Sequence, residues 1–242
     1  MKGNLIIADF SGVYAAEGFL LKLQDKGVPY RLVKLDDIGG TNCYCDRESE
    51  AEVRRRLTPV RTFGIRWIDS GDYHYVSKIF ADGETKPFTL VLVDNHPDDQ
   101  KPAFGDVLSC GSWVREMKER NPMLESVWTL GPGHRIRNDA GTVDRILEGE
   151  IGDLLAALEG KRVYLSVDKD VLDRSAARTD WSQGTYQLSV LKGWIGEILK
   201  KDVFAVDLCG ELTPAKGATS EDLRINCETN VELQDFILDC LK

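Results

Sequence analysis

The sequence predicts an α/β fold, a three-layer αβα arrangement around a mainly parallel sheet. Short apolar runs, rich in β-branched and aromatic residues, alternate with amphipathic stretches along almost the whole chain. This alternation is typical of a parallel sheet with helices on both faces. No repeat, low-complexity segment or linker interrupts it, and 242 residues suit one large domain. We therefore expect residues 1–242 to form a single α/β domain.

The strands are predicted from runs that are short, mostly apolar and bounded by polar or turn residues. In chain order these runs are Asn4–Ala8, Tyr30–Leu35, Phe63–Asp69, Thr89–Asp94, Ser126–Leu130, Arg162–Asp168 and Val203–Leu208. Helices are predicted where apolar residues recur three or four positions apart. These stretches are Tyr14–Lys26, Glu50–Leu57, Ser112–Glu119, Ile151–Leu158, Leu188–Lys200 and Val231–Leu241.

The composition narrows the class of protein. Hydrophobic residues make up 42% of the chain and charged residues 29%, which provides a full core and excludes wholesale disorder. The formal net charge of −9 disfavours nucleic acid as a partner. No apolar run is long enough for a membrane span, and Met1–Phe10 lacks the pattern of a secretory signal. The six cysteines are scattered, so we expect free thiols and a cytoplasmic location.

Acidic and imidazole residues gather where the predicted strands end. Two strands end in Asp94 and Asp168, another carries Asp207, and the run Phe63–Asp69 leads into His74. Ligands of open α/β sheets lie beyond the carboxyl ends of the strands. We therefore predict that the functional site lies at this rim of the sheet.

Two of these segments carry metal-ligating residue types at alternate positions. Asp94 and His96 are two residues apart, as are Asp168 and Asp170, and such residues face the same side of an extended chain. Crowded carboxylates repel one another unless a cation lies between them. Oxygen-rich sites with one or two imidazoles suit Mn²⁺, and Mg²⁺ less well. An Asp at a strand exit also serves as a cap or turn residue, but both segments together with His74 favour a metal site.

Four segments resemble the arginase/agmatinase family of ureohydrolases. Asp94–Asp98 (D-N-H-P-D) is similar to its D-x-H-x-D motif, and Ser166–Asp173 (S-V-D-K-D-V-L-D) is similar to its S-x-D-x-D-x-x-D motif. Ser70–His74 resembles its G-G-D-H element with one extra residue, and Glu211–Pro214 resembles its late E-x-N-P segment. The segments occur in the family's order, so the resemblance implies an arginase-like form of the predicted fold.

The resemblance also implies a pair of Mn²⁺ ions bridged by hydroxide. By position, the implied ligands are His74, Asp94, His96, Asp98, Asp168 and Asp170. His74 and Asp98 would bind one ion, His96 and Asp170 the other, and Asp94 and Asp168 would bridge them. In the family's reaction the hydroxide attacks a guanidino or amidino carbon and an amine leaves. Asp98 would also pass on the proton of the nucleophile, and Glu211 would hold the cationic end of the substrate.

The chain departs from the family pattern at several places. An inserted residue before His74 leaves Asp72 as a competitor for the first ligand position. Lys169 stands where the family usually carries an apolar residue, and alternation predicts that its side chain faces away from the metals. Gly210 lengthens the segment before Glu211 by one residue.

Further residues are candidates for proton transfer and substrate contact. The shuttle histidine of arginases has no counterpart after Asp98. His134 and Arg135 lie in the loop after the predicted strand Ser126–Leu130, at the active rim, so either is a candidate to relay protons or to contact substrate. The alternative for both is a solvated Gly/Pro turn. Trp181 is a candidate to cover the pocket and bind substrate, or else it anchors its loop to the core. Cys209 has no histidine placed to activate it, so we expect a structural role.

The predicted function is a Mn²⁺-dependent hydrolase acting on a linear C–N bond in a cationic guanidino or amidino small molecule. One alternative is a metal-dependent phosphoesterase, although such enzymes usually place D-x-D before the D-N-H element, whereas Asp168 and Asp170 follow it. A second alternative is a non-catalytic regulator with the same fold, because the shuttle histidine is missing and Lys169 is unusual. A homo-oligomer is expected from the resemblance alone, and the sequence does not name the substrate.

Overall fold

The computed structural model describes residues 4–62, 64–131, 145–147 and 151–242. In this part of the chain, one sheet has eight strands in the order β2-β1-β4-β10-β9-β5-β7-β8, and every neighbouring pair in it is parallel. A small second sheet pairs β3 with β6 in antiparallel fashion. The predicted three-layer αβα class with a mainly parallel sheet is confirmed.

Each predicted strand is present, with small shifts at its ends. The bounds in the large sheet are Leu5–Asp9 (β1), Tyr30–Lys34 (β2), Ile65–Ile68 (β4), Phe88–Val93 (β5), Leu124–Leu130 (β7), Arg145–Leu147 (β8), Arg162–Asp168 (β9) and Asp202–Cys209 (β10). The small sheet pairs Tyr44–Cys45 (β3) with Leu108–Ser109 (β6). Strands β1, β4 and β5 are buried along their full length, which explains why they are mostly apolar in the sequence.

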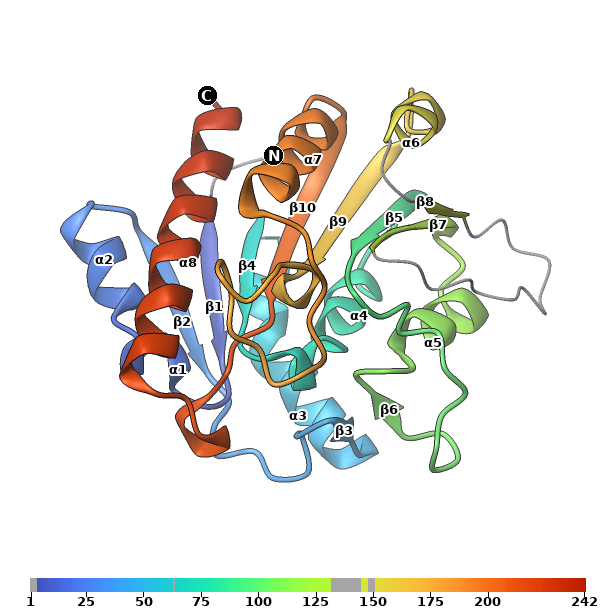
Figure 1. The fold of residues 1–242 in the computed structure, drawn as a ribbon. Coiled ribbons are helices and arrows are strands. Elements are labelled where there is room, and N and C mark those ends of the chain that lie inside the picture. Colours follow the sequence, from blue (N-terminus) through green and yellow to red (C-terminus); the bar gives the residue numbers. More distant parts are fainter. Residues whose placement is uncertain (1–3, 63, 132–144, 148–150) are drawn as a thin grey trace.

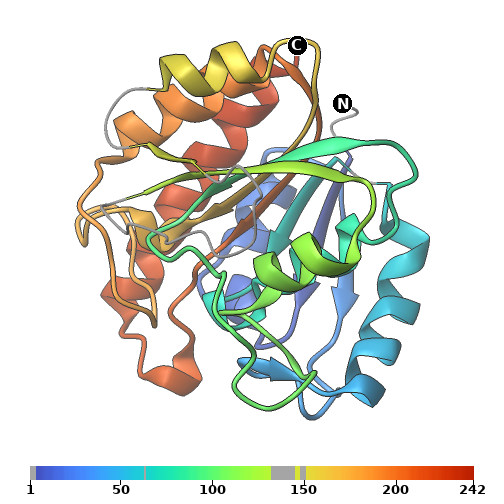
Figure 2. The ribbon, with the colours of Figure 1, turned by 90° about the vertical axis from the view of Figure 1, so that its right-hand side faces the viewer.

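Helices cover both faces of the sheet (Figure 1). The helices of one layer are Val13–Ala16 (α1), Phe19–Asp25 (α2), Gly152–Ala157 (α6), Leu188–Leu199 (α7) and Ser220–Cys240 (α8). The helices of the other layer are Arg47–Leu57 (α3), Val76–Ala81 (α4) and Trp113–Arg120 (α5). Figure 2 shows the sheet between these two layers. Short 3-10 helices are Thr58–Val60 (η1), Gly71–Tyr73 (η2), Lys169–Val171 (η3) and Pro214–Lys216 (η4).

The helices differ from the sequence prediction in three respects. The expected helix Tyr14–Lys26 is divided at Gly18, whose φ of +85° favours glycine and ends the helical turn there. Helix α8 begins earlier than expected, at a capping box formed by Thr219 and Asp222. Helix α4 was not predicted because all its residues are buried, so it has no polar face to give an amphipathic pattern.

The strand order places four carboxyl ends next to one another. Strands β4, β10, β9 and β5 are consecutive in the sheet, and because they are parallel their carboxyl ends meet at one rim.

All six cysteines are free thiols. No helix within the described residues is long and apolar enough to cross a bilayer.

Candidate metal centre and active site

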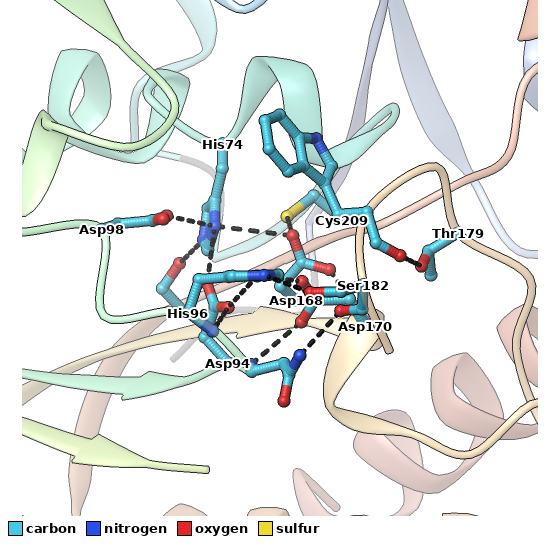
Figure 3. Close-up of polar contacts among 12 residues, drawn as sticks. His74, Asp94, His96, Asp98, Asp168, Asp170, Thr179, Ser182 and Cys209 are labelled. Atoms are coloured by element: carbon cyan, nitrogen blue, oxygen red, sulfur yellow. Dashed lines mark hydrogen bonds and ion pairs between the residues drawn. The ribbon is translucent and has the colours of Figure 1, made fainter. Parts of the chain in front are cut away.

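Strand alternation delivers the candidate ligands to one spot at this rim (Figure 3). Tyr164, at the middle of β9, belongs to the core between the sheet and α4 and α5, and alternation puts Ser166 and Asp168 on the same face. Asp94 directly follows β5, which pairs with β9. His74 directly follows η2 and reaches the same face from the helix layer.

The first half of the cluster surrounds His74, whose exposed fraction is 1%. Its Nδ1 atom lies 3.1 Å from Asp94 Oδ2, 3.2 Å from Asp98 Oδ2 and 3.6 Å from Asp168 Oδ2. Burial alone would lower the pKa of His74, but the neighbouring Cys209 and the carboxylates of Asp94 and Asp98 outweigh it and raise the pKa well above its ordinary value.

The second half surrounds His96, which Asp94 also approaches. His96 Nδ1 lies 2.7 Å from Asp170 Oδ2 and 3.6 Å from Asp94 Oδ1. Asp94 therefore directs one carboxylate oxygen towards each histidine. Asp168 Oδ1 accepts a hydrogen bond of 2.8 Å from the backbone N–H of Asp170, which holds the two aspartates of the second motif together.

The carboxylates of β9 and η3 are strongly perturbed by this crowding. Burial, then the charges of Asp170 and Asp94, raise the pKa of Asp168 well above its ordinary value. Burial and Asp94 raise the pKa of Asp170 to about 7. Hydrogen bonds to Asp170 and Asp94 raise the pKa of His96 to about 11. A bound cation would oppose these upward shifts and favour the deprotonated carboxylates.

Both histidines present the same ring nitrogen to the cluster. Nε2 of His74 lies 2.8 Å from Ser166 Oγ, and Nε2 of His96 lies 2.8 Å from Ser182 Oγ. A proton on Nε2, donated to the serine, leaves the Nδ1 lone pair free to bind a metal. The two serines therefore hold both rings with Nδ1 towards the cluster.

These donors fit a pair of divalent cations. His74, Asp94 and Asp98 form one group with one ligand atom each within 4.8 Å of one another, and Asp94, His96 and Asp170 form a second. At the centre, two buried atoms, His74 Nδ1 and Asp94 Oδ2, make no hydrogen bond to any described residue. These two atoms lie 3.1 Å apart, and a cation between them would take both as ligands.

The cluster forms part of the wall of a cavity of about 300 Å³. Asp94, His96, Asp98, Asp168 and Asp170 line it, and Trp181 stands at its side with 41% of its surface exposed. The Trp181 indole N–H donates a 3.1 Å hydrogen bond to Asp72 Oδ1. A small molecule in this cavity would contact the cluster directly.

Asp98 is fixed beside this cavity by a neighbouring helix. Trp113, the first residue of α5, donates a 2.6 Å hydrogen bond from its indole Nε1 to Asp98 Oδ2. The same ring packs against His74, with ring centroids 4.9 Å apart. Trp113 therefore positions two of the candidate ligands.

Asp72 lies outside the cluster, although the sequence left it as a competitor of His74. Its carboxylate accepts hydrogen bonds from Asn42 Nδ2 at 2.6 Å and from the Cys43 thiol at 3.0 Å, and it forms an ion pair with Lys216. Asp72 thus connects loops around the cavity, while His74 faces the candidate metal centre.

The prediction for Glu211 has to be revised. Glu211 is fully buried and does not line the cavity. Its Oε1 accepts hydrogen bonds from Lys169 Nζ and, at 2.9 Å, from Asn230 of α8. A carboxylate already paired with a buried lysine is not available for the cationic end of a substrate. His134 and Arg135 lie outside the described residues.

Lys169 faces the α8 layer, as strand alternation predicts. Besides Glu211, its Nζ contacts Asn230 Oδ1 at 2.6 Å, and Asn230 donates a 2.7 Å hydrogen bond to Glu17. Burial and the charge of Glu211 raise the pKa of Glu17 well above its ordinary value. A charged network is therefore buried directly behind the two aspartates of the second motif.

Sequence reasoning missed several residues that shape the cluster. Ser166 could have been found, because it lies two residues before Asp168 on the same strand and so shares its face. Ser182 and Trp113 carry no such signal, since each reaches the cluster from a different segment of the chain. Cys209, for which the sequence suggested a structural role, ends β10 beside Asp168.

Removal of the Ser166 hydroxyl is expected to weaken metal binding by about 10–100-fold, the usual effect of losing a hydrogen bond to a metal-binding histidine. The Ser166→Ala variant would leave His74 Nε2 without its 2.8 Å partner. Competition with a metal indicator measures the affinity. Ser126→Ala is a matched control, because Ser126 Oγ contacts Thr89 3.0 Å away. Equal affinities of Ser166→Ala and the wild type would contradict the assigned orientation of the ring.

No protein-family model matches the chain. A curated protein of Thermotoga maritima, described as uncharacterised, is 27% identical over 213 residues, which are 87% of this chain and 81% of that protein. The match extends over most of both chains, and the description of this relative states no activity.

Solved structures of ureohydrolases share the fold. Formimidoylglutamase from Bacillus subtilis subsp. subtilis str. 168 superposes with a TM-score of 0.69 at 17% identity, over 99% of this chain and 87% of that one. Proclavaminate amidino hydrolase from Streptomyces clavuligerus superposes with a TM-score of 0.70 at 14% identity, over 99% of this chain and 93% of that one. Arginase from Bacillus subtilis superposes with a TM-score of 0.64 at 14% identity, over 98% of both chains.

The chain therefore has the arginase-like fold, and the resemblance seen in its sequence motifs is confirmed at the level of the fold. Its candidate metal-ligating clusters lie at the rim where the parallel strands of that fold end.

Proposed function

We propose that the protein is a member of the ureohydrolase superfamily and a binuclear-metal hydrolase of a linear, non-peptide C–N bond in a small guanidino or amidino compound. The observation that carries this proposal is the pair of donor groups that share Asp94 beside a cavity of about 300 Å³. The names of the structures with the same fold, formimidoylglutamase and amidino hydrolase among them, support the substrate class.

In this proposal the chain holds two divalent ions with the residues of the cluster. His74 and Asp98 would hold one ion and His96 and Asp170 the other, with Asp94 and Asp168 as ligands shared between them. Mn²⁺ is the first candidate because most of these donors are carboxylate oxygens. Such a pair of ions supplies a water molecule of lowered pKa and a fixed orientation for the substrate.

The other roles fall to residues of this chain. Asp98, fixed by Trp113 through Oδ2, holds the proton of the attacking water at its carboxylate and transfers it to the departing nitrogen, as a general acid–base group does. Trp181 covers one side of the cavity and limits the access of water to the reacting group. Residues other than Glu211 contact the cationic end of the substrate.

A test of this function compares two substrate panels on the Mn²⁺-loaded and the chelated protein. We expect urea, ammonia or amine to be released from one or more members of a guanidino, amidino and formimidoyl panel, only with metal. Phosphate release from a phosphodiester panel without C–N cleavage would instead favour the phosphoesterase. Normal binding of two ions without turnover of either panel would favour the non-catalytic regulator.

A further inference from the structure

Cys209 places a sulfur atom against the His74 half of the candidate metal centre (Figure 3). It ends β10, where its register partner in β9 is Asp168. Its Sγ atom lies 3.2 Å from Asp168 Oδ2, and its side chain is 1% exposed. His74, Asp168 and Cys209 each offer a ligand atom within 4.8 Å of the others. The thiol is thus as close to the candidate ligands as they are to one another.

The residue after Cys209 makes this approach feasible. Gly210 has a φ of +100°, and a Cβ atom there would lie 2.3 Å from Asp168 Oδ1. Only glycine allows the backbone of β10 to end so close to that carboxylate. The inserted glycine therefore brings the strand end, with its thiol, into the cluster.

An independent observation points to a ligand at the same spot. His74 Nδ1 is buried and makes no hydrogen bond to any residue that the structure describes. It faces Asp168 Oδ2 at 3.6 Å, the same oxygen that the Cys209 thiol contacts. A nitrogen, an oxygen and a sulfur donor thus converge at one buried spot.

We propose that Cys209 is a thiolate ligand of the metal ion on the His74 side, an inference that rests on the proposed metal centre. Its thiol proton would be released to solvent when the ion binds. Sulfur ligands favour Zn²⁺, Co²⁺ or Fe²⁺ over Mn²⁺ and Mg²⁺. The His96 side has only nitrogen and oxygen donors and stays suited to Mn²⁺, so the two sides differ in metal preference.

Cobalt spectroscopy tests this ligand directly. We expect titration of the metal-free protein with Co²⁺ to produce a near-ultraviolet sulfur-to-cobalt charge-transfer band in the wild type. The band should be absent in Cys209→Ser and in Cys209→Ala. Cys110→Ser and Cys43→Ser are matched controls, because both thiols line the same cavity but neither belongs to a donor group of the described residues, and both should keep the band.

Competition between Zn²⁺ and Mn²⁺ measures how much the Cys209 thiol contributes to the metal preference. The ratio of Zn²⁺ to Mn²⁺ affinity should fall at least about tenfold in Cys209→Ser, since even outer contacts of a metal site change affinity by this factor. Two bound Co²⁺ ions without a thiolate band in the wild type would overturn the proposal while leaving the proposed function intact. A wild type that binds neither Co²⁺ nor Mn²⁺ would overturn both.

Discussion

Replacing Asp168 with alanine is expected to reduce kcat/KM at least about 10³-fold, equivalent to about 4 kcal/mol of transition-state stabilisation. It is also expected to reduce the metal content of the protein. Asp168 lies between the two halves of the cluster, with Oδ2 3.6 Å from His74 Nδ1 and Oδ1 accepting the N–H of Asp170. Loss of its carboxylate therefore affects both ions. Elemental analysis and steady-state kinetics on the same preparation measure the two effects.

Two further variants separate this role from a structural one. Asp168→Asn keeps the shape of the side chain and the oxygen that accepts the Asp170 N–H, but lacks the charge, and should lose activity almost as fully as alanine. Asp173→Asn changes the last aspartate of the same motif, whose Oδ1 accepts the Ser175 N–H at 2.8 Å, and should keep both metal and rate. Full activity and full metal content in Asp168→Ala would refute the assigned bridge.

Replacing Lys169 with methionine is expected to lower the free energy of unfolding by about 3–5 kcal/mol, the usual cost of removing one partner of a buried ion pair. Lys169 and Glu211 are both fully buried, and methionine keeps the apolar stem while it removes the charge. The carboxylates of Glu211 and Glu17 would remain without their cation. Urea denaturation of the metal-free protein measures the loss as a shift of the midpoint at an unchanged slope.

A surface lysine provides the control for this effect. Lys192, 27% exposed, forms a 2.8 Å ion pair with Glu232, and Lys192→Met should cost less than about 1 kcal/mol. The double variant Lys169→Met/Glu211→Gln should recover part of the stability, because it removes the uncompensated charge. A loss in Lys169→Met as small as that in Lys192→Met would contradict the buried network.

The architecture and the gathering of ligands follow from patterns that act over short distances in the sequence. Central strands are buried on both faces, so they appear as apolar runs, and their carboxyl ends share one rim. Spacing by two residues then brings Asp94 and His96 together, and Asp168 and Asp170 likewise. The two pairs lie close together because β5 and β9 are neighbours in the sheet. The sequence predicted the shared rim but not this strand order.

The role expected for Glu211 could not be corrected from the sequence. A motif gives the spacing of its residues but not the face that each occupies, and the extra Gly210 changes both. In the structure Glu211 turns towards α8 to meet Lys169, and Cys209 contacts Asp168 of the candidate metal centre instead. The partners that decide these orientations, Asn230 among them, belong to segments distant in the sequence.

Anomalous diffraction at the manganese edge, from crystals grown with excess Mn²⁺, tests the central claim most directly. The account predicts two peaks, one between His74 and Asp98 and one between His96 and Asp170, with Asp94 in contact with both. An absence of peaks at these side chains in crystals of the loaded protein, or carboxylates turned away from one another, would contradict it.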